Sequence, residues 1–154
     1  MDKLNRTEVT IRALCNEDAD AVAQLSIQLG YPASQQEAQK HVDSLINSAD
    51  HQVYVAETAD GSVVGWIQVF TTLRLESEKF AEIGGLIVST EYRRQGIGSL
   101  ILRCAEQWAL DCGLKLIRIR SRSRRMQAHR FFQRFGFQQI KIQYIFDKLL
   151  EDAP

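Results

Sequence analysis

The chain has no apolar run near the roughly 20 residues that a helix needs to cross a bilayer, and no apolar stretch follows its charged start, MDKLNRTEV. A membrane protein or a secreted precursor would show one or the other. We therefore expect a cytoplasmic protein with no membrane partner.

Patterns that hold metals or disulfides are also missing. The three cysteines are odd in number and lack C-x-x-C spacing, and none of the three histidines stands at a metal-ligand spacing. We interpret the cysteines as core or bystander thiols, and we expect no metal site.

A third absence concerns charge. Between residues 113 and 144 there is no Asp or Glu, against seven Arg and two Lys, so this basic segment carries +9. Because the whole chain has a formal net charge of zero, the remainder carries −9. The distribution of charge therefore says more about binding than its sum does.

The composition that is present describes one ordinary domain. With 154 residues, 45% hydrophobic and 25% charged, the chain is large enough to bury its own core. No linker, repeat or low-complexity segment interrupts it. Residues 1–154 are expected to form a single domain.

Hydrophobic periodicity predicts strands and helices along the whole chain. The expected strands span residues 9–14, 51–57, 63–70, 80–88, 114–121 and 137–149. The expected helices span 16–30, a segment that starts at a Ser34–Glu37 capping box, the apolar stripe 97–112, and the stripe 128–135.

The connections between these elements predict the fold. Asp60-Gly61 favours an antiparallel hairpin of the second and third strands, and later strands are joined through helices as β-α-β crossovers. The economical fold is α/β (mixed α+β), with a central mixed, mostly antiparallel sheet flanked by about four helices.

A glycine-containing loop joins a predicted strand to the strongest predicted helix, with the sequence Arg93-Arg94-Gln95-Gly96-Ile97-Gly98-Ser99. Unpaired N–H groups at a helix start bind anions, and glycine lets a phosphate approach the backbone. A Walker loop needs a Lys after its glycine, and a dinucleotide fingerprint needs a small residue where Ile101 stands. We expect this loop to bind a diphosphate. The alternative is that it only caps the helix and that its glycines are incidental.

The letters Arg93-x-x-Gly96-x-Gly98 after a strand resemble the acetyl-coenzyme A (acetyl-CoA) signature, Q/R-x-x-G-x-G/A, of the GNAT acetyltransferases. Alone, this short motif is weak evidence for the family. At the expected distance the chain also resembles the family's A-x-x-F-[FY]-x-x-x-G-F ending, with Ala128, Phe131-Phe132 and Gly136-Phe137. The resemblance spans nearly the whole chain and is nearest to small bacterial aminoalkylphosphonate and aminoglycoside acetyltransferases. It implies an enzyme that uses acetyl-CoA to acetylate a primary amine.

The resemblance also implies which residues hold acetyl-CoA. Backbone amides from Gln95 to Ser99 are expected to bind the pyrophosphate, and Ile87 and Val88 to pair with the pantetheine arm where two parallel strands splay. By the same resemblance, Val88 N–H polarises the thioester carbonyl. The expected cofactor-binding residues are Ile87, Val88, Arg93, Arg94, Gln95, Gly96, Ile97, Gly98, Ser99, Arg125 and Phe132.

A base is required because an alkylammonium with a pKa near ~10 must lose a proton before its nitrogen attacks. Glu82, 14 residues before Gly96, resembles in letters and spacing the catalytic glutamate of the histone-acetylating GNAT branch. We expect it to act directly or through water and to contact the acceptor. A strand-end carboxylate that is solvated or paired is the alternative.

Phe132 stands where many family members carry a Tyr that protonates the departing thiolate. A thiol with a pKa near ~8.5 is already a tolerable leaving group near neutrality, so this change need not abolish activity. Tyr144 substitutes for that acid only if the last strand returns to the cleft.

The arginines of the basic segment have three interpretations. They form a solvated face, they bind coenzyme A phosphates or an anionic acceptor, or they bind nucleic acid. Arg125 stands where many relatives carry Asn. Nucleic acid is disfavoured because the phenylalanines of this segment fit a core stripe rather than exposed stacking positions.

The acceptor is expected to be a small-molecule amine. Tyr31 lies between the first two helices, which border the acceptor cleft in this family, and is a candidate substrate contact; a plain loop residue is the alternative. A homodimer is expected by analogy. The competing functions are a non-catalytic acyl-CoA-binding or regulatory module and a protein lysine or N-terminal acetyltransferase.

Overall fold

The structure is a computed structural model that describes residues 7–151. The chain divides after Ile119 into two units. The first unit holds, in chain order, β1 (Val9–Ala13), η1 (Asn16–Asp18), α1 (Ala19–Gln28), α2 (Gln35–Ile46), β2 (His51–Thr58), β3 (Val63–Thr72), β4 (Phe80–Val88), η2 (Thr90–Tyr92), α3 (Ile97–Asp111) and β5 (Ile117–Ile119). The second unit holds α4 (Met126–Arg134) and the segment that follows it.

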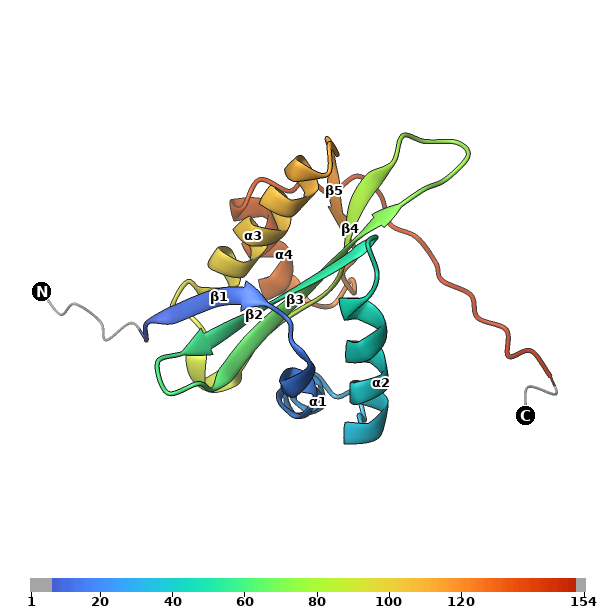
Figure 1. Cartoon of the computed structure of the whole chain (residues 1–154). Helices are drawn as coiled ribbons and strands as arrows, with labels where there is room; N and C mark the ends of the chain where they lie inside the picture. Colours follow the sequence, from blue (N-terminus) through green and yellow to red (C-terminus); the bar gives the residue numbers. More distant parts are fainter. Residues whose placement is uncertain (1–6, 152–154) are drawn as a thin grey trace, which may run out of the picture. The chain divides into compact units, whose positions relative to one another are not determined.

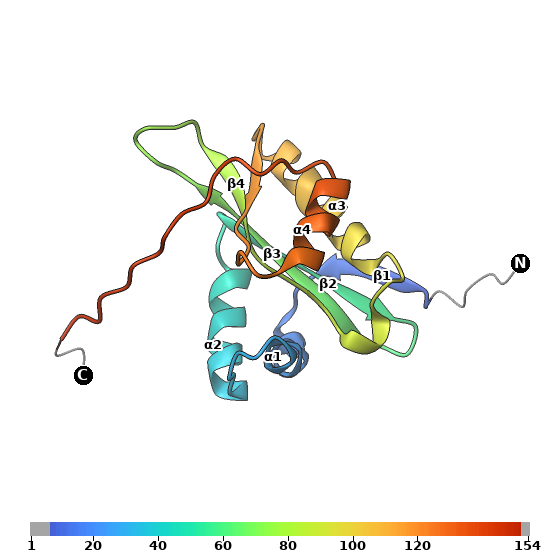
Figure 2. The same cartoon turned by 180° about the vertical axis from the view of Figure 1, so that it is seen from behind.

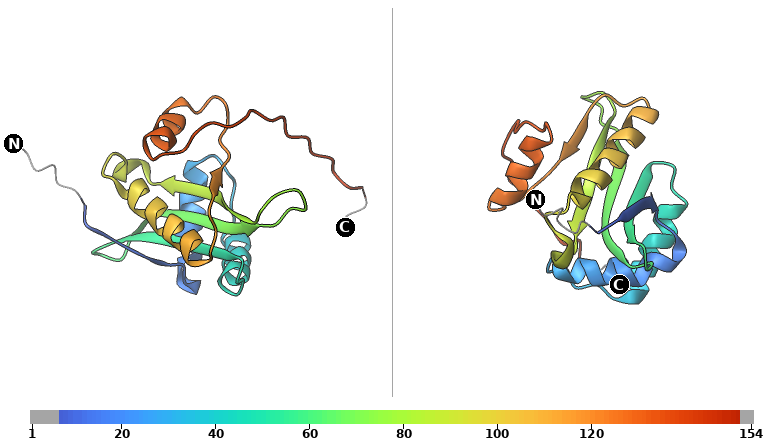
Figure 3. Two further views of the ribbon diagram at one scale, coloured as in Figure 1. Left: turned by 90° about the horizontal axis from the view of Figure 1, so that it is seen from above. Right: turned by 90° about the vertical axis from the view of Figure 1, so that its left-hand side faces the viewer.

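The strands of the first unit form one sheet in the order β1-β2-β3-β4-β5. Neighbours are antiparallel from β1 to β4, and β5 is parallel to β4. Helices α1 and α2 cover one face of this sheet and α3 covers the other (Figures 1 and 3). The mixed, mostly antiparallel sheet with flanking helices is the predicted fold, and it is confirmed.

The core lies where α3 meets the sheet and follows from the strand and helix periods. The alternate residues Ile67 and Val69 of β3 have no exposed surface, and neither have Ile101 and Leu102 on α3. A strand places every second residue on one face, and a helix places residues three or four apart on one side. The apolar stripe 97–112 is therefore the core side of α3.

The parallel pair is short. β5 pairs with β4 only between Ala81–Ile83 and Ile117–Ile119. β4 continues to Val88, so the second half of β4 has no parallel neighbour among the described strands. This is the splayed pair that the sequence predicted.

In the second unit, α4 begins after Arg125 and ends before Gly136, which has a φ of +100° (Figure 2). Phe131 stacks on Phe135 with ring centroids 6.0 Å apart, and Phe132 packs edge-on against Phe137 at 5.8 Å. The predicted helix over 128–135 is confirmed, and its phenylalanines pack with one another.

One strand prediction is wrong, and another is confirmed with shorter bounds. Residues 137–149 form no strand in the described part of the chain, and the strand expected over 114–121 is reduced to three residues. A β-rich sequence becomes a strand only where another backbone pairs with it, and no described strand pairs with 137–149. Arg118 lies on β5, whereas Arg120 and Arg122 follow the end of that strand.

Within the described residues, the structure contains no helix that is both long and apolar enough to cross a membrane. Those residues also contain no cluster of His, Cys, Asp and Glu arranged to hold a metal ion.

Candidate active site

The loop between β4 and α3 starts the helix without a side-chain cap. Gly96 precedes α3 with a φ of +81°, a left-handed conformation that glycine adopts at little cost. Arg94 has a φ of +63° and is the only residue other than glycine with a left-handed backbone among residues 7–151. In this part of the chain no side chain caps α3, and its first turn carries no acidic residue. The helix start therefore presents backbone donors rather than carboxylates.

Three amides follow Gly96 before the helical hydrogen bonds begin. Leu100 N donates to Gly96 O at 3.2 Å, so the N–H groups of Ile97, Gly98 and Ser99 precede the first intrahelical bond. Such amides, at the positive end of a helix dipole, favour an anion. The Ile97 side chain is buried in the core and anchors this turn. The predicted phosphate-binding residues thus form one continuous turn.

A cavity of about 590 Å³ lies beside this turn. Four expected cofactor residues line it, namely Gln95, Gly96, Ile97 and Ser99. The remaining lining residues are Thr7, Glu8, Val9, Thr10, Ala59, Leu100 and Arg103. Sequence analysis missed Leu100 and Arg103, although they follow Gly96 by four and seven residues and so share its side of α3.

Two side chains of the loop hold it in place. Arg93 Nε donates to Val88 O at 3.3 Å, and Gln95 Oε1 accepts from Thr7 N–H at 2.8 Å. The first bond ties the loop to the end of β4, and the second ties it to the residues before β1. Arg94 is exposed. Arg93 and Gln95 therefore position the loop as well as standing in the expected site.

Among residues 7–151, the end of β4 has one edge without a partner strand. Ile87 lies opposite Trp66 and Val88 opposite Gly65 on β3, so that edge is paired. On the other edge β5 reaches no further than Ile83. Backbone groups of an unpaired strand edge are available to an extended ligand. Ile87 and Val88 thus lie at the end of the strand whose following loop leads into the first turn of α3.

Glu82 lies in the middle of the sheet, half-buried on β4. It stands opposite Phe70 on β3 and opposite Arg118 on β5. The Arg118 guanidinium lies over the Phe80 ring, 4.5 Å from its centroid. Directly opposed residues of an antiparallel pair share a face, so Glu82 shares the face of Phe70. A rigid strand, with neighbours on both sides, therefore positions this carboxylate.

Two glycines of β4 make room for side chains from β3. A Cβ on Gly85 would come within 2.7 Å of Trp66 Cη2, and a Cβ on Gly84 within 3.1 Å of Phe70 Cε1. The Trp66 ring therefore lies across the backbone of β4. Sequence analysis read Gly84-Gly85 only as part of a strand and missed this close approach, for which an unexplained glycine pair inside a strand is the available signal.

A hollow of about 240 Å³ lies between α1, α2 and the sheet. Its polar or aromatic lining includes Tyr31, Glu37, His41, Trp66 and Gln68. Trp66 and Gln68 alternate with Phe70 along β3, so they share the face that carries Glu82. The structure therefore brings the two expected acceptor contacts to the same side of the sheet, Tyr31 from the α1–α2 connection and Glu82 from β4.

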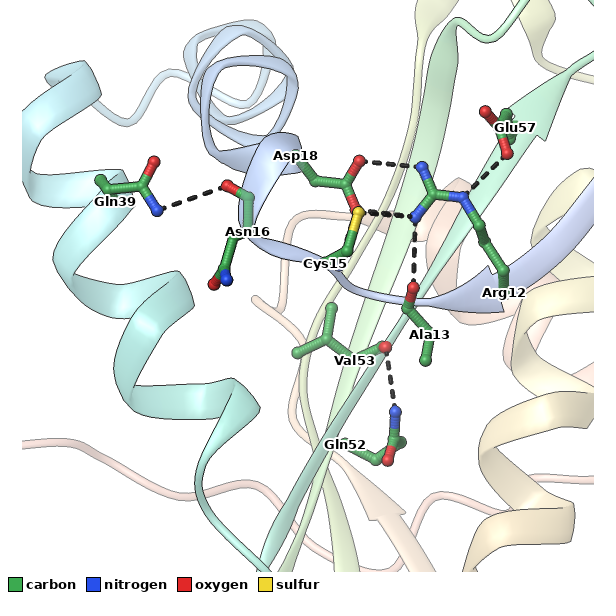
Figure 4. Close-up of polar contacts among 9 residues, drawn as sticks. All are labelled: Arg12, Ala13, Cys15, Asn16, Asp18, Gln39, Gln52, Val53 and Glu57. Atoms are coloured by element: carbon green, nitrogen blue, oxygen red, sulfur yellow. Dashed lines mark hydrogen bonds and ion pairs between the residues drawn. The ribbon is translucent and has the colours of Figure 1, made fainter.

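Figure 4 shows a polar cluster at the start of α1 that the sequence did not reveal. Arg12 Nη1 and Nη2 bond the Asp18 carboxylate at 2.8 and 2.9 Å, and Arg12 Nε bonds Glu57 Oε2 at 2.8 Å. Burial alone would raise the pKa of Asp18, but hydrogen bonds from Arg12 and from Cys15 N–H outweigh it and hold that pKa below its ordinary value. The hydrogen bond to Asp18 likewise raises the pKa of Arg12. This cluster ties β1 and β2 to the helical layer.

Two expected cofactor residues belong to the second unit. Arg125 directly precedes α4, and its N–H donates to Arg122 O at 3.1 Å. Phe132 lies within α4 and packs against Phe131 at 5.6 Å. Their part in holding the cofactor stays a prediction.

Comparison with known proteins agrees with this geometry. The sequence model of the "Acetyltransferase (GNAT) family" matches residues 19–137. The chain is 30% identical to an aminoglycoside N(6')-acetyltransferase type 1 of Stenotrophomonas maltophilia, over 94% of this chain and 95% of the relative. It is 34% identical to an aminoalkylphosphonate N-acetyltransferase of Salmonella typhimurium over 86 residues, which are 55% of this chain and 56% of the relative.

Among solved structures, the fold is similar to the aminoglycoside 6'-N-acetyltransferase AAC(6')-Ih of Acinetobacter baumannii. The TM-score is 0.82 at 18% identity, with 93% of this chain and 99% of the other covered. The predicted fold, cofactor class and acetyltransferase activity are confirmed by the family match and by the relatives. The chain belongs to the acetyltransferase (GNAT) family, the N-acetyltransferases that use acetyl-CoA.

Proposed function

We propose that this protein transfers the acetyl group of acetyl-CoA to a primary amine of a small molecule, by direct attack within a ternary complex. One observation carries the proposal: the unpaired half of β4 runs into an uncapped helix start. An extended edge followed by an anion site suits a ligand made of an extended arm and a diphosphate. The names of the relatives support a small amine as acceptor.

The residues of the turn fit the cofactor. The amides that follow Gly96 and the absence of a carboxylate from the described first turn of α3 suit a pyrophosphate, and Arg93 and Arg94 add positive charge. Ile87 and Val88 would hold the pantetheine arm on the open edge of β4. When bound, acetyl-CoA supplies the acetyl group as a thioester.

Glu82 is the proposed general base. It accepts a proton from the ammonium, directly or through water, so that the nitrogen lone pair becomes available for attack on the carbonyl carbon. Val88 N–H donates a hydrogen bond to the carbonyl oxygen as negative charge develops there. No protein acid is assigned to the sulfur, because Phe132 carries no proton and a thiolate is a tolerable leaving group.

Tyr31 is the proposed acceptor contact on the side of the sheet that carries Glu82. Its side chain is half exposed at the hollow between α1, α2 and the sheet. An aromatic ring suits a cation on an apolar scaffold. Tyr31→Ala should raise the KM for the amine and leave the KM for acetyl-CoA unchanged.

Four further proposals concern the protein as a whole. Residues 1–154 act as one N-acetyltransferase domain, as the family match across the boundary at Ile119 supports. The protein forms a homodimer, acts in the cytoplasm, and binds neither nucleic acid nor membranes. Salt-sensitive binding to duplex or single-stranded DNA, or to anionic vesicles, would contradict the last point.

The first experiment is release of coenzyme A, followed with a thiol reagent, when the protein and acetyl-CoA meet a panel of amines. The panel should include aminoalkylphosphonates, aminoglycosides, polyamines and lysine peptides. Release with a small amine supports the proposal, whereas release with peptides alone favours the protein-acetylating alternative. Calorimetric binding of coenzyme A without turnover on the whole panel favours the non-catalytic binding module.

A further inference from the structure

Two arginines contact the ring of Phe80, the first residue of β4. The guanidinium carbon of Arg118, on β5, lies 4.5 Å from the ring centroid, and that of Arg74, on the connection between β3 and β4, lies 5.7 Å from it. Phe80 is only 4% exposed, so packing holds its ring in place. Two positive charges therefore lie beside one ring, although like charges repel each other.

No carboxylate of the described residues neutralises this arginine pair, Arg74 and Arg118. Neither side chain forms an ion pair or a hydrogen bond with another residue of 7–151, whereas Arg12 is bound by two carboxylates. Glu76 and Glu78, on the same connection as Arg74, are exposed and do not pair with it. Each guanidinium has five N–H donors in a planar fork. The donors of both forks are therefore available to a group from outside the chain.

The arginine pair lies on the side of the sheet that carries the proposed acceptor contacts. Phe80 precedes Glu82 by two residues on β4, so their side chains share a face and stand about 7 Å apart along the strand. Arg118 stands opposite Glu82 on the parallel strand β5, and aligned residues of neighbouring strands share a face. The arginine pair is therefore next to the proposed general base.

One buried polar group on this face also lacks a partner. Thr72 stands opposite Phe80 on β3, and its hydroxyl is buried without a hydrogen bond to any of the described residues. Buried hydroxyl groups nearly always have a partner. A hydroxyl and two guanidinium groups around one residue are donors that suit an anion with several oxygens.

We propose that Arg74 and Arg118 bind an anionic group of the acceptor, which is therefore a short amine that also carries a phosphonate or a carboxylate. The inference rests on the acetyl transfer proposed above and narrows its acceptor, which that proposal leaves as any small amine. With the anion at the arginine pair, the nitrogen of a short chain reaches Glu82. An acceptor with several amines would instead bring further positive charge toward two guanidinium groups, which repel it.

The test compares acceptors with the same aminoethyl chain. 2-Aminoethylphosphonate and β-alanine carry an anion, and β-alaninamide is the neutral match. Release of coenzyme A by the wild type should give a kcat/KM about 100-fold higher for an anionic acceptor than for β-alaninamide, the usual effect of hydrogen bonds between charged groups. Preference for either anionic amine supports the site.

Arg74→Gln with Arg118→Gln should lower kcat/KM for the preferred anionic amine by about 100-fold and leave the values for β-alaninamide and the KM for acetyl-CoA unchanged. Lys79→Gln with Lys115→Gln is the matched control, because it removes two charges from exposed positions just before the same two strands. This control should change neither acceptor. Coenzyme A binding by calorimetry shows that each variant is folded.

The outcomes separate this inference from the proposed acetyl transfer. A wild type that acetylates β-alaninamide as fast as the anionic amines, or an arginine variant that loses all acceptors equally, overturns the anion site and keeps the transfer. If no amine is acetylated, calorimetry tests the site by itself. Binding of 2-aminoethylphosphonate to the wild type saturated with coenzyme A, lost in the arginine variant, supports the site without the transfer. No binding, or equal binding by both proteins, overturns the site.

Discussion

Glu82, the proposed general base, illustrates how a strand fixes the backbone of a single residue in this protein. It lies on β4, and backbone pairing on both sides limits its movement. A base on a central strand is held more tightly than one on a loop, because neighbouring strands fix its backbone. This favours proton removal in a defined geometry over the alternative of a merely solvated carboxylate, and the choice is open to direct measurement.

Glu82→Gln should lower kcat/KM for the amine by about 10²–10⁴-fold, the usual contribution of a general base, because the amide cannot accept the ammonium proton. Calorimetry should show unchanged affinity for coenzyme A. Glu78→Gln is the matched control, since Glu78 is an exposed carboxylate on the loop before β4. Equal turnover by wild type and Glu82→Gln would remove Glu82 from the mechanism.

Gly85→Ala should destabilise the fold by about 1–3 kcal/mol, because its Cβ would meet Trp66 Cη2 and the indole would have to move. Trp66→Phe removes the atoms that clash. Urea unfolding should therefore show that the double variant loses less stability than the sum of the two single losses. Additive losses would mean that the ring does not lie across Gly85.

Asp18→Asn should lower the free energy of unfolding by about 2 kcal/mol at pH 7, because it removes a carboxylate that Arg12 bonds twice. The lowered pKa of Asp18 means that its contribution is complete above the unfolded-state pKa near ~3.9 and is lost as pH falls through the folded-state value. The difference between wild type and variant should therefore shrink below about pH 4. Asp43→Asn, at an exposed site on α2, should show no such pH-dependent gap.

Helix α3 joins the fold to the site. Its apolar stripe packs on the sheet, and this packing holds its first turn at the end of β4. A helix start normally has a side-chain cap, which contributes about 1 kcal/mol. In the described structure α3 lacks that cap. This leaves the amides that a cap would satisfy for the coenzyme A pyrophosphate that we propose binds at this turn.

Gly96→Ala should weaken coenzyme A binding by about 10-fold. An alanine at φ +81° costs about 1–2 kcal/mol, so the unliganded loop would relax to another conformation and binding would have to restore the original one. Gly113→Ala is the control. Gly113 has a φ of +78° after the other end of α3, and nothing lies within 4 Å of a Cβ at either glycine. Both variants should lose stability, and only Gly96→Ala should lose affinity in calorimetry.

The molecule as a whole combines an acidic and a basic part. The second unit, residues 120–154, contains eight Lys or Arg and three Asp or Glu, so its net charge is +5 and that of the first unit is −5. Opposite net charges of equal size favour association of these parts over separation in water, and the effect weakens with salt. This supports the proposal that residues 1–154 work as one domain.

Heating should therefore unfold the protein in one cooperative transition, with equal calorimetric and van't Hoff enthalpies. Coenzyme A at about 100 times its Kd should add about 2.7 kcal/mol of stability and raise Tm by about 5–10 °C. Scanning calorimetry with and without coenzyme A measures both. Two separated transitions, of which coenzyme A shifts one, would show that the units on either side of Ile119 unfold independently.

The sequence alone determined the features that depend on neighbours within a few residues. It placed the helices and most strands, the hairpin at Asp60-Gly61 and the turn before α3, because periodicity, glycine stops and turn preferences act locally. It also identified the family, since the two motifs lie at fixed spacing. Tyr31 and Glu82 were named as candidates, but their common face was not visible.

Tertiary structure decided everything that joins residues far apart in the chain. The Trp66 ring over Gly85 and the bond from Arg12 to Glu57, 45 residues away, arise from sheet register. The strand predicted over 137–149 failed because strand formation needs a second backbone, and no described strand pairs with that segment. A helix satisfies its backbone within its own segment, but a strand depends on a partner that no local pattern can specify.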